Sequence, residues 1–148
     1  MFITGVRHLK IWVTDLGRSR AFYEKVFRLE HSISFADDDG VVRGMSFRIP
    51  GVAFELAIRE NPELAKAMHD ADPFALATTR EGLEQWVEHL DRLDIWHPPI
   101  VRASRGWACG FRDPDGIQIR LYAYDEEVAG ETGDHVVSGG APKKWMGS

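Results

Sequence analysis

The chain is 148 residues long and carries 18 Lys and Arg against 23 Asp and Glu, which gives a formal net charge of −5 at pH 7. An acidic chain lacks the basic surface that neutralises nucleic-acid phosphates or anionic lipids, so we expect no nucleic-acid partner and no membrane partner. The composition, 44% hydrophobic and 28% charged, is that of an ordinary globular protein with one sizeable core. A small-molecule partner is therefore expected.

The cysteine content and the N-terminal residues indicate the cellular compartment of the protein. Cys109 is the single cysteine, which excludes an intramolecular disulfide and a cysteine-based zinc cluster. The opening stretch MFITGVRHLKIWV holds Arg7 and Lys10 among its apolar residues and has no cleavage signature. No apolar run approaches the roughly 18 residues that a membrane-spanning helix needs. We expect a cytoplasmic protein.

The first half of the chain predicts a strand, a helix and three strands. Residues 6–13 form the first strand, and Thr14-Asp15 is a helix-start signal before LGRSRAFYEKVFRL. The apolar stripe of this helix is predicted to be Leu16, Phe22, Val26 and Leu29. Three extended stretches follow at residues 31–35, 42–49 and 52–58, separated by the turn clusters at 37–40 and 50–51.

The second half repeats this order after a modestly helical link over residues 60–72. The pattern predicts a strand at 74–78, a helix over REGLEQWVEHLDRL, and strands at 107–111 and 117–124. A stretch broken by Pro98 and Pro99 separates that helix from the strands that follow it.

The two halves can be placed on each other residue by residue. Laying HLKIWVTDLG over PFALATTREG sets His8 on Pro73, and laying GVAFEL over GIQIRL sets Gly51 on Gly116. The second overlay also sets Glu55 on Arg120. We therefore predict an α+β fold of two β-α-β-β-β modules, about residues 5–59 and 73–124, within a single domain spanning residues 1–124.

Residues 125–148 form a polar, Gly-rich tail, DEEVAGETGDHVVSGGAPKKWMGS. Alone, such a segment buries too little apolar surface to fold. Two alternatives stay open: a disordered tail, and an arm ordered along the domain or along a neighbouring subunit.

The stretches HLKIWVTDLGRSRAFYEKVF and GWACGFRDPDGIQIRLYAY resemble the vicinal oxygen chelate superfamily, which contains glyoxalases, bleomycin-resistance proteins and extradiol dioxygenases. The resemblance implies that the modules pair into a half-open barrel, in a homodimer, around a concave cavity that holds a divalent metal. It places the metal ligands on the first and last strand of each module. Those positions are His8, Glu55, Pro73 and Arg120.

Strand alternation agrees with a shared cavity face, because successive side chains of a strand point to opposite sides. Trp107 is a further candidate for an aromatic wall against a ligand, although its phase with Phe111 favours the helix side. The residues expected to face the cavity are His8, Lys10, Trp12, Glu55, Gln118, Arg120 and Tyr122.

The implied metal set is only half present. Proline cannot ligate a metal, and the fixed cation of Arg120 is repelled by one. No cofactor is therefore favoured, and a divalent metal held by His8 and Glu55 is the alternative. We expect instead that Arg120 takes over the electrostatic role of the metal, pairs with Glu55 and lies beside His8.

Two functions stay open, and with them the question of whether the chain is an enzyme. One is a protein that binds a small aromatic or amphiphilic molecule in the concave cleft, with a degenerate metal site; Lys10, Trp12, Trp107, Gln118 and Tyr122 would contact the ligand. The other is a metal-dependent lyase, isomerase or dioxygenase of the same superfamily. In it, His8, Glu55 and Arg120 would be the catalytic residues.

Overall fold

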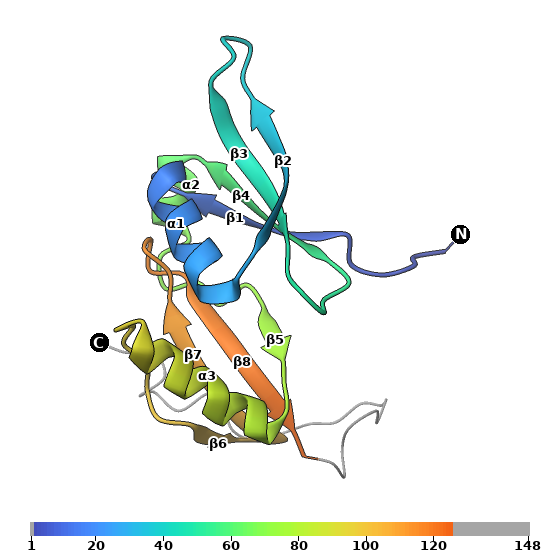
Figure 1. Cartoon of the computed structure of the whole chain (residues 1–148), viewed down its shortest axis with the longest axis vertical. Helices are drawn as coiled ribbons and strands as arrows, with labels where there is room; N and C mark the ends of the chain where they lie inside the picture. Colours follow the sequence, from blue (N-terminus) through green and yellow to red (C-terminus); the bar gives the residue numbers. More distant parts are fainter. Residues whose placement is uncertain (1, 126–148) are drawn as a thin grey trace. The chain divides into compact units, whose positions relative to one another are not determined.

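The computed structural model describes residues 2–125, so the predicted tail lies outside the described residues except for Asp125. The chain divides into two compact units. Among the described residues, unit 1 contains those up to His69 together with the turn Asp113–Gly116, and unit 2 contains Asp70–Arg112 and those from Ile117 to Asp125. Each unit holds one predicted module, so the predicted duplication is confirmed (Figure 1).

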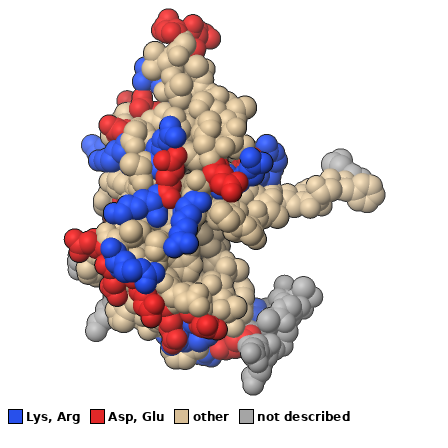
Figure 2. Space-filling view, viewed as in Figure 1, with Lys and Arg blue, Asp and Glu red and all other residues tan. Residues whose placement is uncertain are grey.

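Unit 1 is a four-stranded mixed sheet with two helices. The sheet order is β1-β4-β3-β2, with β1 parallel to β4 and the other pairs antiparallel. Figure 2 shows acidic side chains at the tip of the β2–β3 hairpin, where the turn reads Asp-Asp-Asp-Gly. The elements are β1 (His8–Val13), α1 (Leu16–Phe27), β2 (Glu30–Ala36), β3 (Val42–Arg48), β4 (Glu55–Glu60) and α2 (Pro62–Ala67).

Unit 2 repeats this topology, although its first two strands are shorter, with 3 residues each. Its sheet order is β5-β8-β7-β6, and β5 is parallel to β8 as β1 is to β4. No helix in the described part of the chain is long and apolar enough to cross a membrane. The elements are β5 (Ala75–Ala77), α3 (Arg80–Arg92), β6 (Val101–Ala103), β7 (Gly106–Arg112) and β8 (Gln118–Tyr124).

Local sequence signals explain where these elements begin and turn. Asp15 caps α1 by accepting a hydrogen bond from the Arg18 N–H, and Thr79 caps α3 through the Gly82 N–H. Gly51 and Gly116 have φ of 80° and 83°, a left-handed conformation that glycine adopts without strain. The matching conformations confirm the predicted equivalence of these two turns.

The overlay of His8 on Pro73 is wrong. In unit 1 the residue opposite Glu55 is His8, whereas in unit 2 the residue opposite Arg120 is Ala75. An overlay without gaps could not find this pairing, because the distance from strand to helix differs: His8 lies eight residues before Leu16, the first residue of α1, and Ala75 lies five residues before Arg80, the first residue of α3. Hydrogen bonding sets the strand pairing, and the Thr78 N–H donates to the Tyr122 carbonyl. Alanine, like proline, carries no metal-ligating side chain.

The predicted buried stripe of α1 is partly wrong. Leu16 and Val26 are buried as predicted, but Phe22 is only half-buried, and Leu29 lies beyond the helix. The helix ends at Phe27 because Arg28 adopts a left-handed conformation, with φ of 52°. The buried side chains of α1 are Leu16, Ser19, Tyr23, Val26 and Phe27.

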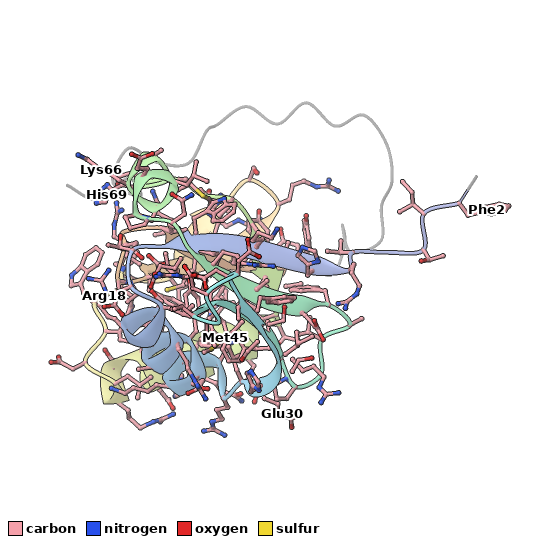
Figure 3. The ribbon with its side chains drawn as sticks, turned by 90° about the horizontal axis from the view of Figure 1, so that it is seen from above. Phe2, Arg18, Glu30, Met45, Lys66 and His69 are labelled. Carbon is pink, nitrogen blue, oxygen red and sulfur yellow. The ribbon has the colours of Figure 1, made fainter. Side chains whose placement is uncertain are left out.

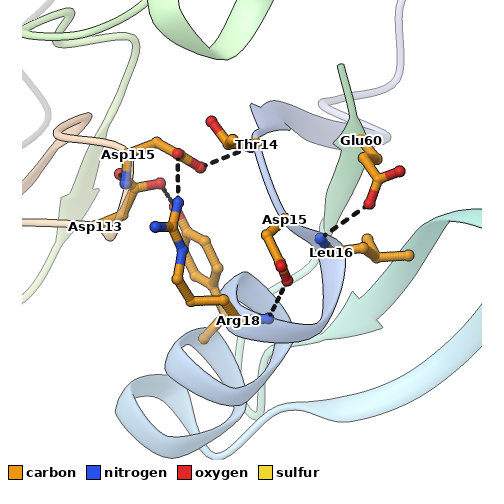
Figure 4. A network of polar contacts seen from close by, with 8 residues as sticks. Thr14, Asp15, Leu16, Arg18, Glu60, Asp113 and Asp115 are labelled. Carbon is orange, nitrogen blue, oxygen red and sulfur yellow. Dashed lines mark hydrogen bonds and ion pairs between the residues drawn. The ribbon is translucent and has the colours of Figure 1, made fainter. Parts of the chain in front are cut away.

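The turn Asp113–Gly116 belongs to unit 1 although the strands that it joins belong to unit 2. The hydroxyl of Tyr23 on α1 donates to the buried Asp113 carboxylate at 2.8 Å. Asp115 accepts hydrogen bonds from the Thr14 N–H at 2.9 Å and from the Arg18 guanidinium at 2.7 Å (Figure 4). This turn therefore supplies acceptors at the start of α1.

Replacing Tyr23 by Phe removes the hydrogen bond that its hydroxyl donates to the buried Asp113 carboxylate. We expect the free energy of unfolding at pH 7 to fall by about 1–3 kcal/mol, measured by urea denaturation. Burial, then the charge of Asp113, raises the pKa of Tyr23 well above 10.0. The unfolded state alone loses this proton above about pH 10, so the stability advantage of wild type over Tyr23→Phe narrows there.

The matched control is Tyr124→Phe, because Tyr124 is 57% exposed. Its free energy of unfolding should equal that of wild type at pH 7. A wild-type advantage over Tyr23→Phe that is constant through pH 11 would contradict the proposed role of the buried hydroxyl.

Candidate functional site

The register of the unit 1 sheet places three rows of side chains on one face, because residues directly opposite each other on neighbouring strands point to the same side. The other face carries the core residues Ile11, Leu56 and Ile58, which are buried, and α1 contacts β4. The three rows make up what we call the open face: Trp12, Arg59, Gly44 and Phe35; Lys10, Ala57, Ser46 and Ile33; His8, Glu55 and Arg48.

A pocket of about 420 Å³ lies on this open face. Ser46 and Ala57 form its floor, where their small side chains leave room above the middle of the sheet. Its volume falls in the range of roughly 300–1,000 Å³ that is common for small-molecule sites. The remaining lining residues are Arg7, His8, Lys10, Ile33, Phe35, Glu55 and Arg59.

Both carboxylate oxygens of Glu55 are engaged within unit 1. Arg7 donates to Oε2 at 3.1 Å, and the Ser32 hydroxyl donates to Oε1 at 2.9 Å. These hydrogen bonds, of which that from Arg7 contributes most, hold the pKa of Glu55 below its usual value. Glu55 is therefore a charged, positioned group in the wall of the pocket.

Arg59 is held across the sheet by its neighbours. Its guanidinium carbon lies 4.1 Å from the centroid of the Phe35 ring, a cation–π contact. A Cβ atom at Gly44 would collide with the Arg59 side chain, so glycine there provides the space that Arg59 occupies. Within residues 2–125, Arg59 has no carboxylate partner.

His8 and Lys10 line the same pocket from β1. His8 is exposed directly opposite Glu55 in the register, so the prediction that these two residues share a face is confirmed. The Lys10 ammonium lies 5.7 Å from the Trp12 ring centroid, and Trp12 is half-buried on the same face. Neither His8 nor Lys10 meets a carboxylate among the residues that the structure describes.

The predicted residues of unit 2 form a separate group on β8. Arg120 forms an ion pair with Asp72, and the Gln118 side chain donates to the Asp70 carbonyl at 3.1 Å. The Tyr122 hydroxyl accepts from the Arg105 N–H at 3.2 Å. The predicted pair of Arg120 with Glu55 would join the two units and stays a prediction.

Trp107 lies on the helix side of the unit 2 sheet. It is opposite Ala123, in phase with Phe111 and out of phase with Arg120. The Arg80 guanidinium, from the first turn of α3, lies 5.1 Å from its ring centroid. Strand alternation thus turns Trp107 toward α3, the side that its phase with Phe111 favoured, and a ligand contact of Trp107 stays a prediction.

Comparison with known proteins gives the family. The family model of the Glyoxalase/Bleomycin resistance protein/Dioxygenase superfamily matches residues 5–121. The chain belongs to this superfamily. Among curated proteins, none matches the sequence.

Solved structures share the superfamily fold with this chain. A mutant of the fosfomycin resistance protein FosX from Listeria monocytogenes, complexed with Mn(II) and 1S,2S-dihydroxypropylphosphonic acid, is 23% identical, with a TM-score of 0.66 over 86% of this chain and 98% of that one. A domain from Frankia sp. EAN1pec is 19% identical, with a TM-score of 0.68 over 84% and 100%. TnmS3, an antibiotic binding protein from Streptomyces sp. CB03234, is 18% identical, with a TM-score of 0.69 over 84% and 99%.

The described residues of the unit 1 pocket offer few ligands for a divalent metal. In the described part of the chain, no group of three or more His, Cys, Asp or Glu side chains is arranged so that it could hold a metal ion. His8 and Glu55 make a pair, but both oxygens of Glu55 already accept hydrogen bonds. Arg7 and Arg59 bring positive charge to the same pocket, and this charge repels a divalent metal ion.

Sequence reasoning missed several pocket residues. Arg7 and Arg59 were not singled out, and neither were Phe35 and Ser46, although all four line the pocket. One signal for the pocket was present in the sequence: the small residues Gly44 and Ser46 alternate with larger residues on β3, as expected where a strand forms the floor of a pocket. In unit 2, the partner Asp72 was also missed.

Arg7→Gln should raise the pKa of Glu55 toward that of an ordinary glutamate, because the Arg7 hydrogen bond is the largest cause of its lowering. The measurement is the ¹³C shift of the Glu55 carboxyl carbon as a function of pH. Arg48→Gln is the control, since Arg48 contributes a weaker Coulombic effect. An equal or larger rise in the control would show that the Arg7 contact does not form.

Proposed function

We propose that the chain binds a small aromatic or amphiphilic molecule in the pocket on the open face of unit 1, without the divalent metal of the superfamily. The observation that carries this proposal is a roomy pocket with a small floor in which the one carboxylate, Glu55, is already held by Arg7 and Ser32. A carboxylate so engaged is a poor metal ligand but a good positioning group for the arginine beside it.

The structural neighbours support binding as the shared activity. One FosX structure holds a phosphonic acid, and TnmS3 is described as an antibiotic binding protein. We extend small-molecule binding to this chain, with Lys10 and Trp12 as contacts from β1. On the unit 2 sheet, we keep the proposed ligand contacts of Gln118, Arg120 and Tyr122. We also keep the proposal of a single domain with the predicted module boundaries.

An enzyme of the same superfamily is the second candidate. It is favoured by His8, an exposed imidazole directly opposite the charged Glu55. In such an enzyme His8 would exchange a proton with a substrate in the pocket, and Arg120 would stabilise developing negative charge. A homodimeric state and a cytoplasmic location complete both proposals.

The proposal is tested by filling the pocket. Ala57→Leu places a larger side chain on the floor, and we expect it to lower the affinity for the fluorescent neutral probe N-phenyl-1-naphthylamine by about tenfold or more through steric exclusion. The measurement is fluorescence titration. Addition of EDTA to wild type should leave this affinity unchanged.

Ala67→Leu is the matched control, because it makes the same change at an exposed position on α2. It should bind the probe as wild type does. Unchanged binding by Ala57→Leu, or binding that disappears with EDTA, would contradict metal-free binding in this pocket.

A further inference from the structure

We infer that the ligand of the unit 1 pocket is an amphiphilic anion: a carboxylate, phosphonate or sulfonate group held by Arg59 and Lys10, joined to an apolar body that lies against Ile33 and Phe35. This inference rests on the proposed function and names the class of ligand that the pocket takes. It follows from the charge of the pocket, from the way Arg59 is held, and from the arrangement of residues across the sheet.

Positive charge is concentrated in the pocket of an otherwise acidic chain. Arg7, Lys10 and Arg59 face a single carboxylate, Glu55, in a chain whose formal net charge is −5. Arg7 and Glu55 neutralise each other at 3.1 Å, which leaves two cations without a carboxylate in the described part of the chain. An anionic ligand would relieve the mutual repulsion of these two cations.

The arginines on β7 and β8 of unit 2 differ from Arg59, because each forms an ion pair with an acidic side chain. Arg120 is paired with Asp72, and Arg112 is paired with Asp70. The chain thus supplies an acidic partner for each of these arginines, just before β5, but leaves Arg59 and Lys10 of unit 1 without one among the described residues. Charge is therefore available for a ligand in the unit 1 pocket.

Arg59 is organised before any ligand arrives. The Phe35 ring and the space above Gly44 fix its long side chain across the sheet. A side chain that is already ordered loses less conformational entropy on binding, and a guanidinium can donate two parallel hydrogen bonds to one carboxylate or phosphonate. Lys10 adds a second positive charge from the neighbouring strand, β1.

The pocket combines cationic and apolar side chains across the strand order β1-β4-β3-β2, and the Arg59 guanidinium reaches the Phe35 ring on β2. Lys10 and Arg59 lie on β1 and β4, Ser46 lies on β3, and Ile33 and Phe35 lie on the edge strand β2. Ile33 is 49% exposed, so its apolar surface is open to a ligand. A molecule that joins a charged group to an apolar body matches this arrangement, because the Arg59 guanidinium and the exposed apolar surface of Ile33 line the same pocket.

Two probes that differ by one sulfonate test the inference: 8-anilino-1-naphthalenesulfonate and its neutral analogue N-phenyl-1-naphthylamine. We expect wild type to bind the sulfonate more tightly at low ionic strength, with an advantage that shrinks as salt is added. Arg59→Ala should lower the ratio of the two affinities by about tenfold, the loss expected for one charge-assisted hydrogen bond. Gly44→Ala should lower the same ratio by displacing the Arg59 side chain.

Arg20→Ala is the matched control, since Arg20 lies on α1 and pairs with Glu24. It should leave the ratio unchanged. Arg59→Lys, which keeps the charge but not the paired donors, should fall between wild type and Arg59→Ala.

The outcomes separate this inference from the proposed function. Equal affinities for both probes, lost together in Ala57→Leu and unaffected by Arg59→Ala, would overturn the anionic class while leaving binding in the pocket intact. Failure of both probes to bind, or binding that Ala57→Leu does not reduce, would overturn both. A preference for the sulfonate that depends equally on Arg20 and Arg59 would show general charge attraction and overturn the role of Arg59.

Discussion

The parallel pairing of β1 with β4 is the constraint on which the candidate site depends. Its register sets His8 opposite Glu55, Lys10 opposite Ala57 and Trp12 opposite Arg59. A slip by one residue would turn every side chain of a strand to the other face, exposing core residues and burying charged ones. Because Ile11 and Ile58 are fully buried, the core itself fixes the register that brings the pocket residues together.

The chemistry of the pocket follows from which charges are already satisfied. Arg7 and Ser32 hold Glu55, so the carboxylate that would otherwise serve a metal acts within the protein. Arg59, in contrast, is held by an aromatic ring and by the absence of a side chain at Gly44. These contacts position the guanidinium without neutralising it, which suits a pocket that binds through charge.

The fold could be predicted from the sequence because its signals are local and occur twice. Helix caps at Asp15 and Thr79 and left-handed glycines at 51 and 116 mark the same steps in each module. Alternation along β1 also gave the correct face for His8 and Lys10. Arg59 and Phe35 could not be found in this way, because their meeting depends on cross-strand register, and β2 pairs with β3 through irregular steps near His31 and Phe35.

The N-terminal segment before β1 begins with exposed apolar residues, and Phe2 lies away from the sheet (Figure 3). Unit 1 also includes the turn Asp113–Gly116, which follows β7 in the sequence and is therefore far from the rest of this unit along the chain. A gene fragment ending at residue 69 would omit the acceptors of Tyr23 and Arg18. Although the two modules look like products of duplication, the first takes hydrogen-bond acceptors from a turn in the second half, so splitting the gene between them would remove these contacts from the first module.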